Sequence, residues 1–180
     1  METAVKTVWA IDPTHSEVQF KVKHLVISTV TGLFHKFDGK IETEGDDFDG
    51  AKASFEAEID SISTNNKDRD AHLKSGDFFD AANHPKLTFE STSFTKKSED
   101  EYELKGIMTI RGNAKEITLK AEYGGTVVDP YGNTKAGFEI SGKINRKEFG
   151  LTWSATTEAG GLVVSDDVRL ALNVQFAKQG

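Results

Sequence analysis

Apolar and polar residues alternate with a period of two along most of this chain, and no other feature restricts its fold as strongly. In the segment EVQFKVKHL, Val18, Phe20, Val22 and His24 fall on one face, and most of the polar residues fall on the other. This period is typical of half-buried antiparallel strands. About nine such segments follow one another, many of them longer than the usual strand of about five or six residues, and helical periodicity is nearly absent. The sequence therefore predicts an all-β fold.

Long antiparallel strands with one hydrated face must bury the other face, either in a sandwich or in a closed barrel. Gly39, Gly106 and Gly142 fall inside strand segments, where glycine often marks the bends that closure of a barrel needs. We therefore expect an antiparallel β-barrel of about eight strands, formed by residues 1–180 as a single domain.

Several inward-facing positions of the expected barrel carry small residues, such as Ala53, Ala57 and Gly142, which cannot fill its interior. Large inward residues supply an apolar wall, so we expect a long, narrow lumen that suits a linear hydrophobic ligand. A dry core that is fully packed is the alternative. The residues expected to line the lumen are Phe20, Val22, Phe55, Ala57, Phe89, Leu104, Met108, Leu119, Phe138, Ile140, Leu170 and Leu172.

The segment SISTNNKDRDAHLKSGDFFDAANHP, residues 61–85, interrupts the alternation. It is too long for a structureless loop in a small barrel, so we expect a short helical insert that acts as a lid. Asn65 or Asn66 is the expected cap of its helix, and Leu73, Phe78 and Phe79 are expected to pack onto the opening. In a simple meander of strands, alternate connections share one end of the barrel. The connections expected at the lid end are residues 26–32, 60–85, 111–113 and 146–166. Those expected at the opposite end are residues 12–16, 45–50, 96–100 and 124–135.

Arg146 and His24 end inward-facing rows at this same mouth. A buried guanidinium needs an acidic partner or an anionic ligand head group. Arg146 is therefore expected either to pair with Asp68, Asp70 or Asp77 of the insert or to contact a head group. His24 has the same two roles open to it, as a ligand contact or as a donor to a loop carbonyl.

No catalytic or metal-binding motif stands out. His72 and His84 are too far apart for the ligand spacings of zinc sites, and Asp68 and Asp70 flank Arg69 in what reads as a solvated cluster of charges. No nucleophile elbow, phosphate loop or dinucleotide fingerprint is present. We expect no catalytic residue and no metal.

The formal net charge of −7 opposes binding to nucleic acid and to anionic membranes as a whole. The absence of cysteine excludes disulfides and thiolate metal sites. No apolar run is long enough to span a membrane, and the start METAVKTVWAID lacks the apolar region of a signal peptide. These features predict a cytoplasmic protein, or a periplasmic one if a signal peptide has been removed.

Six segments together resemble the YceI-like family of lipocalin-like, polyisoprenoid-binding proteins over nearly the whole chain. They are DPTHSEVQFKVKHL, TGLFHKFDGKIE, NKDRDAHLKSGDFFDAANHPKLTFES, LKGIMTIRGNAKEITL, INRKEFGLTW and GGLVVSDDVRL. The resemblance implies a lipocalin-like barrel with a helical insert near one mouth, and a lumen that binds isoprenoid lipids such as polyprenyl phosphates or quinones. It implies no catalytic set and no cofactor other than such a bound lipid, and it also implies a homodimer. Glu148 stands where the family often has Asp.

The family elements R-D-x-H-L, F-F-D and I-N-R fall on the insert and on the segment around Arg146. The candidate residues for the lid or the ligand head group are His24, Arg69, Asp70, His72, Phe78, Phe79 and Arg146. The expected function is non-enzymatic binding, transport or storage of a long-chain isoprenoid or similar amphipathic lipid. Two alternatives stay open: a lipid-modifying enzyme that uses His24 with a carboxylate of the lid, and a stress-linked interaction protein with a filled core.

Overall fold

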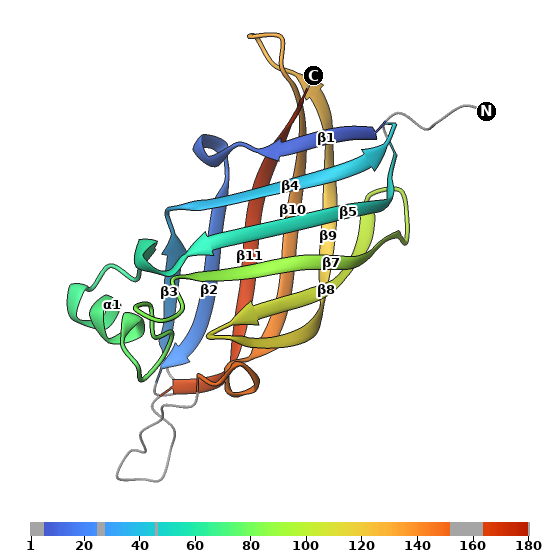
Figure 1. Ribbon diagram of the computed structural model, residues 1–180. Coiled ribbons are helices and arrows are strands. Elements are labelled where there is room, and N and C mark those ends of the chain that lie inside the picture. The colour runs from blue at the N-terminus through green and yellow to red at the C-terminus, as the bar shows by residue number, and fades with distance from the viewer. Residues whose placement is uncertain (1–5, 25–27, 46, 152–163, 180) are drawn as a thin grey trace.

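A computed structural model describes residues 6–24, 28–45, 47–151 and 164–179 (Figure 1). The strands are β1 (Lys6–Ile11), β2 (Glu17–His24), β3 (Ser28–Phe34), β4 (Phe37–Glu44), β5 (Asp47–Glu58), β6 (Ile62–Ser63), β7 (Lys86–Lys96), β8 (Glu101–Ile110), β9 (Asn113–Val128), β10 (Thr134–Asn145) and β11 (Val164–Lys178). The helices are α1 (Lys67–Lys74) and the short 3₁₀ segments η1 (Pro13–His15), η2 (Ile59–Ser61) and η3 (Arg146–Phe149).

The strands form one closed antiparallel β-barrel, as the alternation predicts. Every pairing between neighbouring strands is antiparallel, and β1 pairs with β11 to close the sheet on itself. Figure 1 shows β1, β4, β5, β7 and β8 crossing in front of β2, β9, β10 and β11, so the barrel consists of two steeply crossed layers.

Three of the barrel's eight strands are each made of two segments. Both β1 and β2 pair with β11, with Ile11 opposite Phe176 and Glu17 opposite Asn173, so they run in the same direction. In the same way β3 continues into β4, and β5 continues through η2 into β6. The expected strand reversal at residues 12–16 is therefore wrong. Pro13 has no N–H to give to a ladder, so η1 bends the strand without reversing it.

A polar cluster holds this bend in place. Asp12 caps η1 by accepting a hydrogen bond from the Thr14 backbone N–H (3.1 Å), and it also contacts His15 Nδ1 (2.8 Å). Its carboxylate forms an ion pair with Lys135 of β10, and both side chains are largely buried, with exposed fractions of 14% and 13%. The hydrogen bond from Lys135, followed by those from His15 and Thr14, lowers the pKa of Asp12 well below its usual range.

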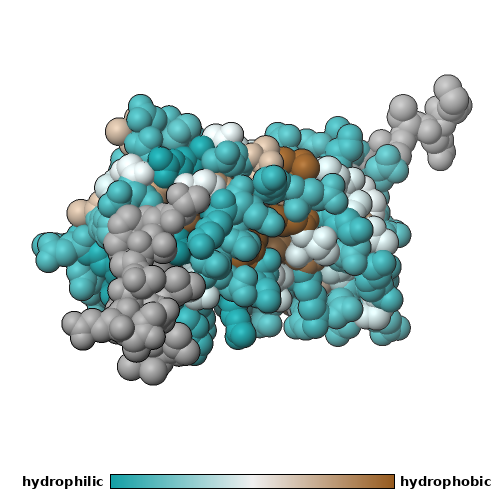
Figure 2. Space-filling model, turned by 90° about the horizontal axis from the view of Figure 1, so that it is seen from below, coloured by the Kyte–Doolittle hydropathy of each residue, from teal (hydrophilic) through white to brown (hydrophobic). Residues whose placement is uncertain are grey.

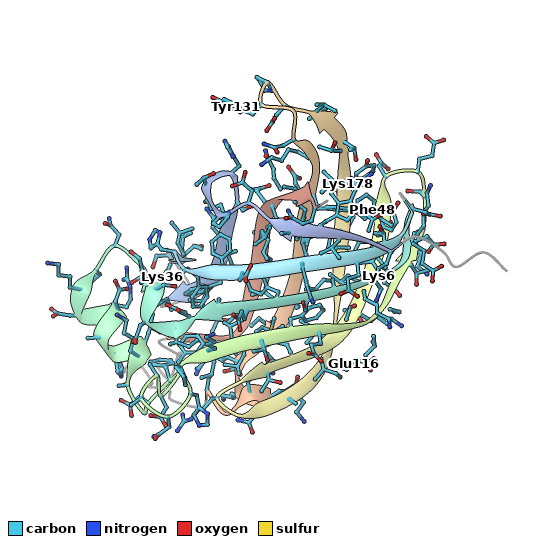
Figure 3. All side chains as sticks on the ribbon, turned by 45° about the horizontal axis from the view of Figure 1, so that its top comes forward. Lys6, Lys36, Phe48, Glu116, Tyr131 and Lys178 are labelled. Carbon is cyan, nitrogen blue, oxygen red and sulfur yellow. The ribbon has the colours of Figure 1, made fainter. Side chains whose placement is uncertain are left out.

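The meander places alternate connections at the same end, as expected. The segment between β6 and β7, the turn between β8 and β9, and η3 lie at one end, which we call the lid end. The turns that follow β7 and β9 lie at the opposite end, which we call the far end. Figure 3 shows Lys36 on the side of the lid and Phe48 at the opposite side. Residues 28–32, expected in a connection, belong to β3 because they continue its ladder with β2.

Aromatic rings fill the barrel interior at the far end. Phe138 lies at their centre, with ring centroids 5.1 Å from Phe48, 6.0 Å from Phe94 and 6.2 Å from Phe176. The other members of this aromatic plug are Trp9, Tyr102 and Tyr123. Such edge-to-face and tilted pairs add to the stabilisation that burial of the rings provides. At this end, the packed core considered as an alternative is what the chain forms.

The lid contains the expected short helix. Asn66, rather than Asn65, caps α1, because its Oδ1 accepts a hydrogen bond from the backbone N–H of Arg69 (3.0 Å). The helix ends at Lys74 and buries none of its residues. The apolar contacts of the lid come from Leu73 and from the turns that follow the helix, where Phe78 is buried and Phe79 packs against the core.

Candidate functional site

An apolar cavity of about 150 Å³ lies inside the barrel between the lid and the aromatic plug. Each of the eight barrel strands contributes to its wall, from Ile11 on β1 round to Leu172 on β11. Eleven of the twelve residues expected in the lumen line it: Phe20, Val22, Phe55, Phe89, Leu104, Met108, Leu119, Phe138, Ile140, Leu170 and Leu172. The twelfth, Ala57, is buried but does not reach the cavity; its cross-strand neighbour Leu87 lines it instead.

The cavity is long and narrow. Val168 and Phe176 of β11 both line it, and eight residues of strand span about 26 Å at roughly 3.3 Å per residue. With the usual tilt of barrel strands, this corresponds to about 20 Å along the barrel axis. A small volume drawn out over this length suits an extended chain better than a ring system.

The floor and the roof of the cavity come from different parts of the chain. Phe94, Phe138 and Phe176 of the aromatic plug form the floor. Leu73, Phe78 and Phe79 of the lid line the other end, where the Phe79 ring meets Phe34 edge to face at 6.3 Å. The expected packing of these three lid residues onto the opening is therefore what the structure shows.

The polar lid residues anchor the lid rather than line the cavity. Asp70 accepts hydrogen bonds from the backbone N–H (2.7 Å) and Oγ1 (2.5 Å) of Thr64, just after β6. Arg69 donates from Nε to Thr64 Oγ1 (2.8 Å) and from Nη2 to the Thr64 carbonyl (2.6 Å). His72 contacts Asp77 (2.9 Å) and meets the Phe78 ring edge to face. None of the three charged or titratable side chains Arg69, Asp70 and His72 borders the cavity.

A further anchor connects the lid to the barrel. Arg111 donates from Nη1 to the carbonyls of Phe78 (3.0 Å) and Gly150 (3.3 Å), so it joins the lid to the segment after η3. Asn113 donates to the Phe149 carbonyl (2.8 Å) close by. Sequence reasoning did not identify Arg111, although its position beside Gly112 in a tight turn marks it as a residue at the mouth.

Arg146 lines the cavity at the lid end and is only 2% exposed. It donates from Nε to the Ser165 carbonyl (2.9 Å) and from Nη1 to the Leu151 carbonyl (2.7 Å), and its Nη2 lies 3.7 Å from Asp166. Burial lowers the pKa of Arg146, and the charge of Asp166 opposes that shift.

The expected pair of Arg146 with Asp68, Asp70 or Asp77 is wrong. Asp166 stands at the start of β11, the strand beside the one that Arg146 follows, and is therefore closer than any lid carboxylate. Arg146 thus joins the two ends of the connection between β10 and β11. His24 ends β2 opposite Ser28, but its side chain lies outside the described residues.

Within the described ranges, no three His, Asp or Glu side chains come together in a way that could hold a metal ion. Among the same residues, no helix has the length and apolarity needed to cross a membrane.

Comparison with known proteins gives consistent matches over almost the whole chain. A model of the YceI-like domain matches residues 9–176. A UPF0312 protein of Staphylococcus epidermidis is 35% identical over 172 residues, which cover 95% of this chain and 98% of that protein. The crystal structure of the Campylobacter jejuni YCEI protein is 34% identical, with a TM-score of 0.76 over 88% of this chain and 90% of that one. A polyisoprenoid binding domain from Saccharophagus degradans has the same fold at 15% identity, with a TM-score of 0.69 over 95% of this chain and 98% of that one.

Proposed function

The chain belongs to the YceI-like family, and from its lumen we propose that it is a non-enzymatic protein that binds the hydrocarbon chain of an isoprenoid or similar amphipathic lipid. Binding of this kind serves storage or transport of the lipid. The single observation that carries the proposal is the narrow apolar channel, about 20 Å long, that runs from the lid to the aromatic plug.

The lining of the channel supports binding rather than catalysis. Its charged members are Arg146 and Lys40. Arg146 is engaged with Ser165, Leu151 and Asp166, and Lys40 forms an ion pair with Glu42 (3.4 Å). The remaining wall is almost entirely aliphatic and aromatic, so it offers burial to a ligand and little acid or base chemistry.

The fold comparison supports the choice of ligand class. The structure from Saccharophagus degradans is described as a polyisoprenoid binding domain, and its barrel superimposes on this one over most of both chains. An isoprenoid tail is an extended, flexible chain that carries methyl branches. Such a chain fits a narrow channel lined by Phe, Leu and Ile side chains.

Burial alone supplies ample affinity. At about 25 cal/mol per Å², burial of roughly 400 Å² of tail contributes on the order of 10 kcal/mol before the costs of ordering. Part of that gain is spent on moving wall side chains, because an empty volume of about 150 Å³ admits only a short hydrocarbon group without rearrangement.

A series of prenyl alcohols of increasing length tests the proposal, with affinity measured by calorimetric titration of the delipidated protein. We expect affinity to rise with tail length until the channel is filled. In Phe138→Leu, which shortens a side chain of the floor, the preferred length should increase. In the matched control Phe48→Leu, which alters the plug without lining the channel, the preferred length should stay the same.

Absence of binding by every alcohol would refute the proposal. A preferred length that moves equally in both variants would place the tail outside this channel. Mass spectrometry of the ligand recovered after binding completes the test, because recovery of a chemically altered lipid would favour the lipid-modifying enzyme.

A further inference from the structure

The barrel wall contains a slit between β9 and β10. Their ladder begins at Thr134 opposite Val128 and ends at Ser141 opposite Lys120. Beyond that pair, β9 continues beside β8 and β10 continues beside β11 (Figure 1). The hydrogen bond from Asn113 to the Phe149 carbonyl brings the two sides together again at the lid end. The slit is therefore bounded at both ends, with residues 114–119 on one side and 142–148 on the other.

Two leucine side chains separate the lumen from the surface at this slit. A hollow of about 750 Å³ on the outer surface is lined by Leu119, Gly142 and Leu170 among others. Leu119 and Leu170 also line the lumen. Gly142 has no side chain, and Leu119 occupies the space that a Cβ atom there would need. The side of the molecule in Figure 2 shows a narrow band of hydrophobic side chains within a mainly hydrophilic surface.

Three cations form a row across the outer face beside this slit. Lys143 of β10 lies directly opposite Arg169 of β11, and Arg169 lies directly opposite Lys21 of β2. All three are exposed and line the hollow. Side chains in directly opposed positions have Cβ atoms about 5 Å apart, and like charges placed there destabilise a sheet. We call these residues the basic row.

The basic row is poorly neutralised by the protein. Lys143 Nζ lies 3.7 Å from Asp167, whereas Arg169 and Lys21 form no ion pair within the described part of the chain. Across the hollow, by contrast, Lys120 is paired with Glu101 (3.1 Å) and Glu122 (3.0 Å). Positive charge without an ion-pair partner thus lies on Arg169 and Lys21, one and two strands from the β10 edge of the slit, in a chain whose net charge is −7.

Other routes into the lumen are less suited to an anion. The aromatic plug fills the far end, and hydrogen bonds of Arg111 and Asp70 hold the lid in place. Near the bend of the first strands, Lys40 reaches the cavity wall, but Glu42 pairs with it, and Asp38 and Glu56 face each other on the adjoining ladder. Lys6 also pairs with Glu42, and Lys86 pairs with Glu56, so the charges there are balanced and offer an anionic head group little net attraction.

We propose that the slit is a lateral entrance to the lumen, gated by Leu119, and that the basic row binds the anionic head group of an amphiphile whose tail lies in the channel. The inference rests on the proposed function and extends it by assigning the head-group charge and its position. A phosphate-type head group fits the row because its oxygens can accept charge-assisted hydrogen bonds from Arg169 and from both lysines. The head group then stays in solvent, while the tail passes over Gly142 and between Leu119 and Leu170 into the lumen.

The test compares geranylgeranyl phosphate with geranylgeraniol, which have the same tail. Affinities are measured for the wild type and for a triple variant, Lys21→Gln, Lys143→Gln and Arg169→Gln. The matched control is Lys36→Gln, Lys52→Gln and Lys96→Gln, three exposed lysines away from the slit with the same loss of charge. We expect the first variant to bind the phosphate at least about tenfold more weakly and the alcohol unchanged, and the control to retain both affinities.

Loss of affinity for the alcohol as well, or an unchanged affinity for the phosphate, would overturn the head-group site. Equal losses in the two triple variants would show a general effect of charge and would also overturn it. Tight binding of inorganic phosphate alone would make the row a site for free phosphate. Failure of the wild type to bind either lipid would refute the proposed function itself, so the two failures are distinguishable.

Exchange kinetics test the entrance. Leu119→Ala should raise both the association and the dissociation rates of geranylgeraniol, whereas Leu87→Ala, an equal truncation of the lumen wall away from the slit, should change mainly the dissociation rate. Identical rate changes in the two variants would refute a gate at Leu119.

Discussion

Leu119 of β9 lies across Gly142 of β10 so closely that a Cβ atom at position 142 would overlap the Cδ2 atom of Leu119. The two residues lie just beyond the last pair of the β9–β10 ladder, which is Lys120 opposite Ser141. The ladder hydrogen bonds between β9 and β10 therefore stop before this point. Closure of the barrel wall here is a matter of side-chain packing. The absence of a side chain at Gly142 is what makes that packing fit.

Gly142→Ala should therefore destabilise the protein by about 1–3 kcal/mol, the usual range for an overpacked core. The added methyl group forces Leu119 out of its position. In a Leu119→Ala background the same substitution should cost much less, because the overlapping atoms are gone. Urea unfolding of the four proteins of this double-mutant cycle measures the coupling.

Gly137→Ala on the same strand is the control, since a Cβ atom there meets nothing within 4 Å. It should change the free energy of unfolding by no more than about 0.5 kcal/mol. Additive effects of Gly142→Ala and Leu119→Ala would show that the two side chains do not compete for the same space.

The ion pair of Asp12 with Lys135 should make stability depend on pH in the acidic range. The pKa of Asp12 is lower in the folded protein than in the unfolded chain, so folding gains stability from the carboxylate above about pH 4, the ordinary value for Asp. That gain is lost as the pH falls below about 4 towards the folded pKa. Asp12→Asn should cost about 2 kcal/mol at pH 7 and should flatten the loss of stability below pH 4.

Chemical unfolding from pH 7 down to the lowest pH at which the wild type still folds checks this expectation. Glu116→Gln is the control, because Glu116 is exposed and makes no ion pair within the described ranges (Figure 3). An Asp12→Asn profile parallel to that of the wild type at every pH would assign the lost stability to causes other than titration of Asp12.

Much of this architecture is predictable from the alternation of residues, because burial of one strand face requires it. The barrel, the helical lid and eleven lumen residues all follow from that pattern and from Asn66 and Leu73 in the insert. The alternation fails at irregular points of the sheet. A bulge between Ser91 and Ser93 reverses the phase of β7, so Phe94 faces the lumen although Leu87 and Phe89 set the opposite parity.

Side-chain contacts between residues far apart in the sequence could not be predicted either. Arg146 reads correctly as a buried cation, but its partner Asp166 is chosen by the pairing of β10 with β11 and not by the richness of the lid in carboxylates. The basic row is hidden for the same reason. Lys21, Lys143 and Arg169 are ordinary surface residues in the sequence, and only the register of three strands sets them side by side.

Arg146→Met should lower the free energy of unfolding by about 3 kcal/mol, because it removes the buried donor to two carbonyls and leaves Asp166 with Lys147 (3.4 Å) as its remaining ion-pair partner. Asp166→Asn in addition should recover part of that loss. The ratio of affinities for geranylgeranyl phosphate and geranylgeraniol should change by less than about twofold, since Arg146 is engaged by the protein. A tenfold change in this ratio would instead make Arg146 the head-group ligand.

A ligand could enter the lumen through the lid or through the slit, and the variant Asp70→Ala distinguishes these two routes. Asp70→Ala removes two of the four side-chain hydrogen bonds that join α1 to Thr64, at a cost of about 1–3 kcal/mol confined to the lid. Hydrogen exchange of the backbone amides of residues 67–80 should therefore become faster. Asp68→Ala is the matched control, because Asp68 also lies in the first turn of α1 but is exposed.

If the slit is the entrance, Asp70→Ala leaves the dissociation rate of geranylgeraniol as it is in the wild type, whereas Leu119→Ala raises it. Faster release in Asp70→Ala, together with an unchanged rate in Leu119→Ala, would transfer the entrance from the slit to the lid.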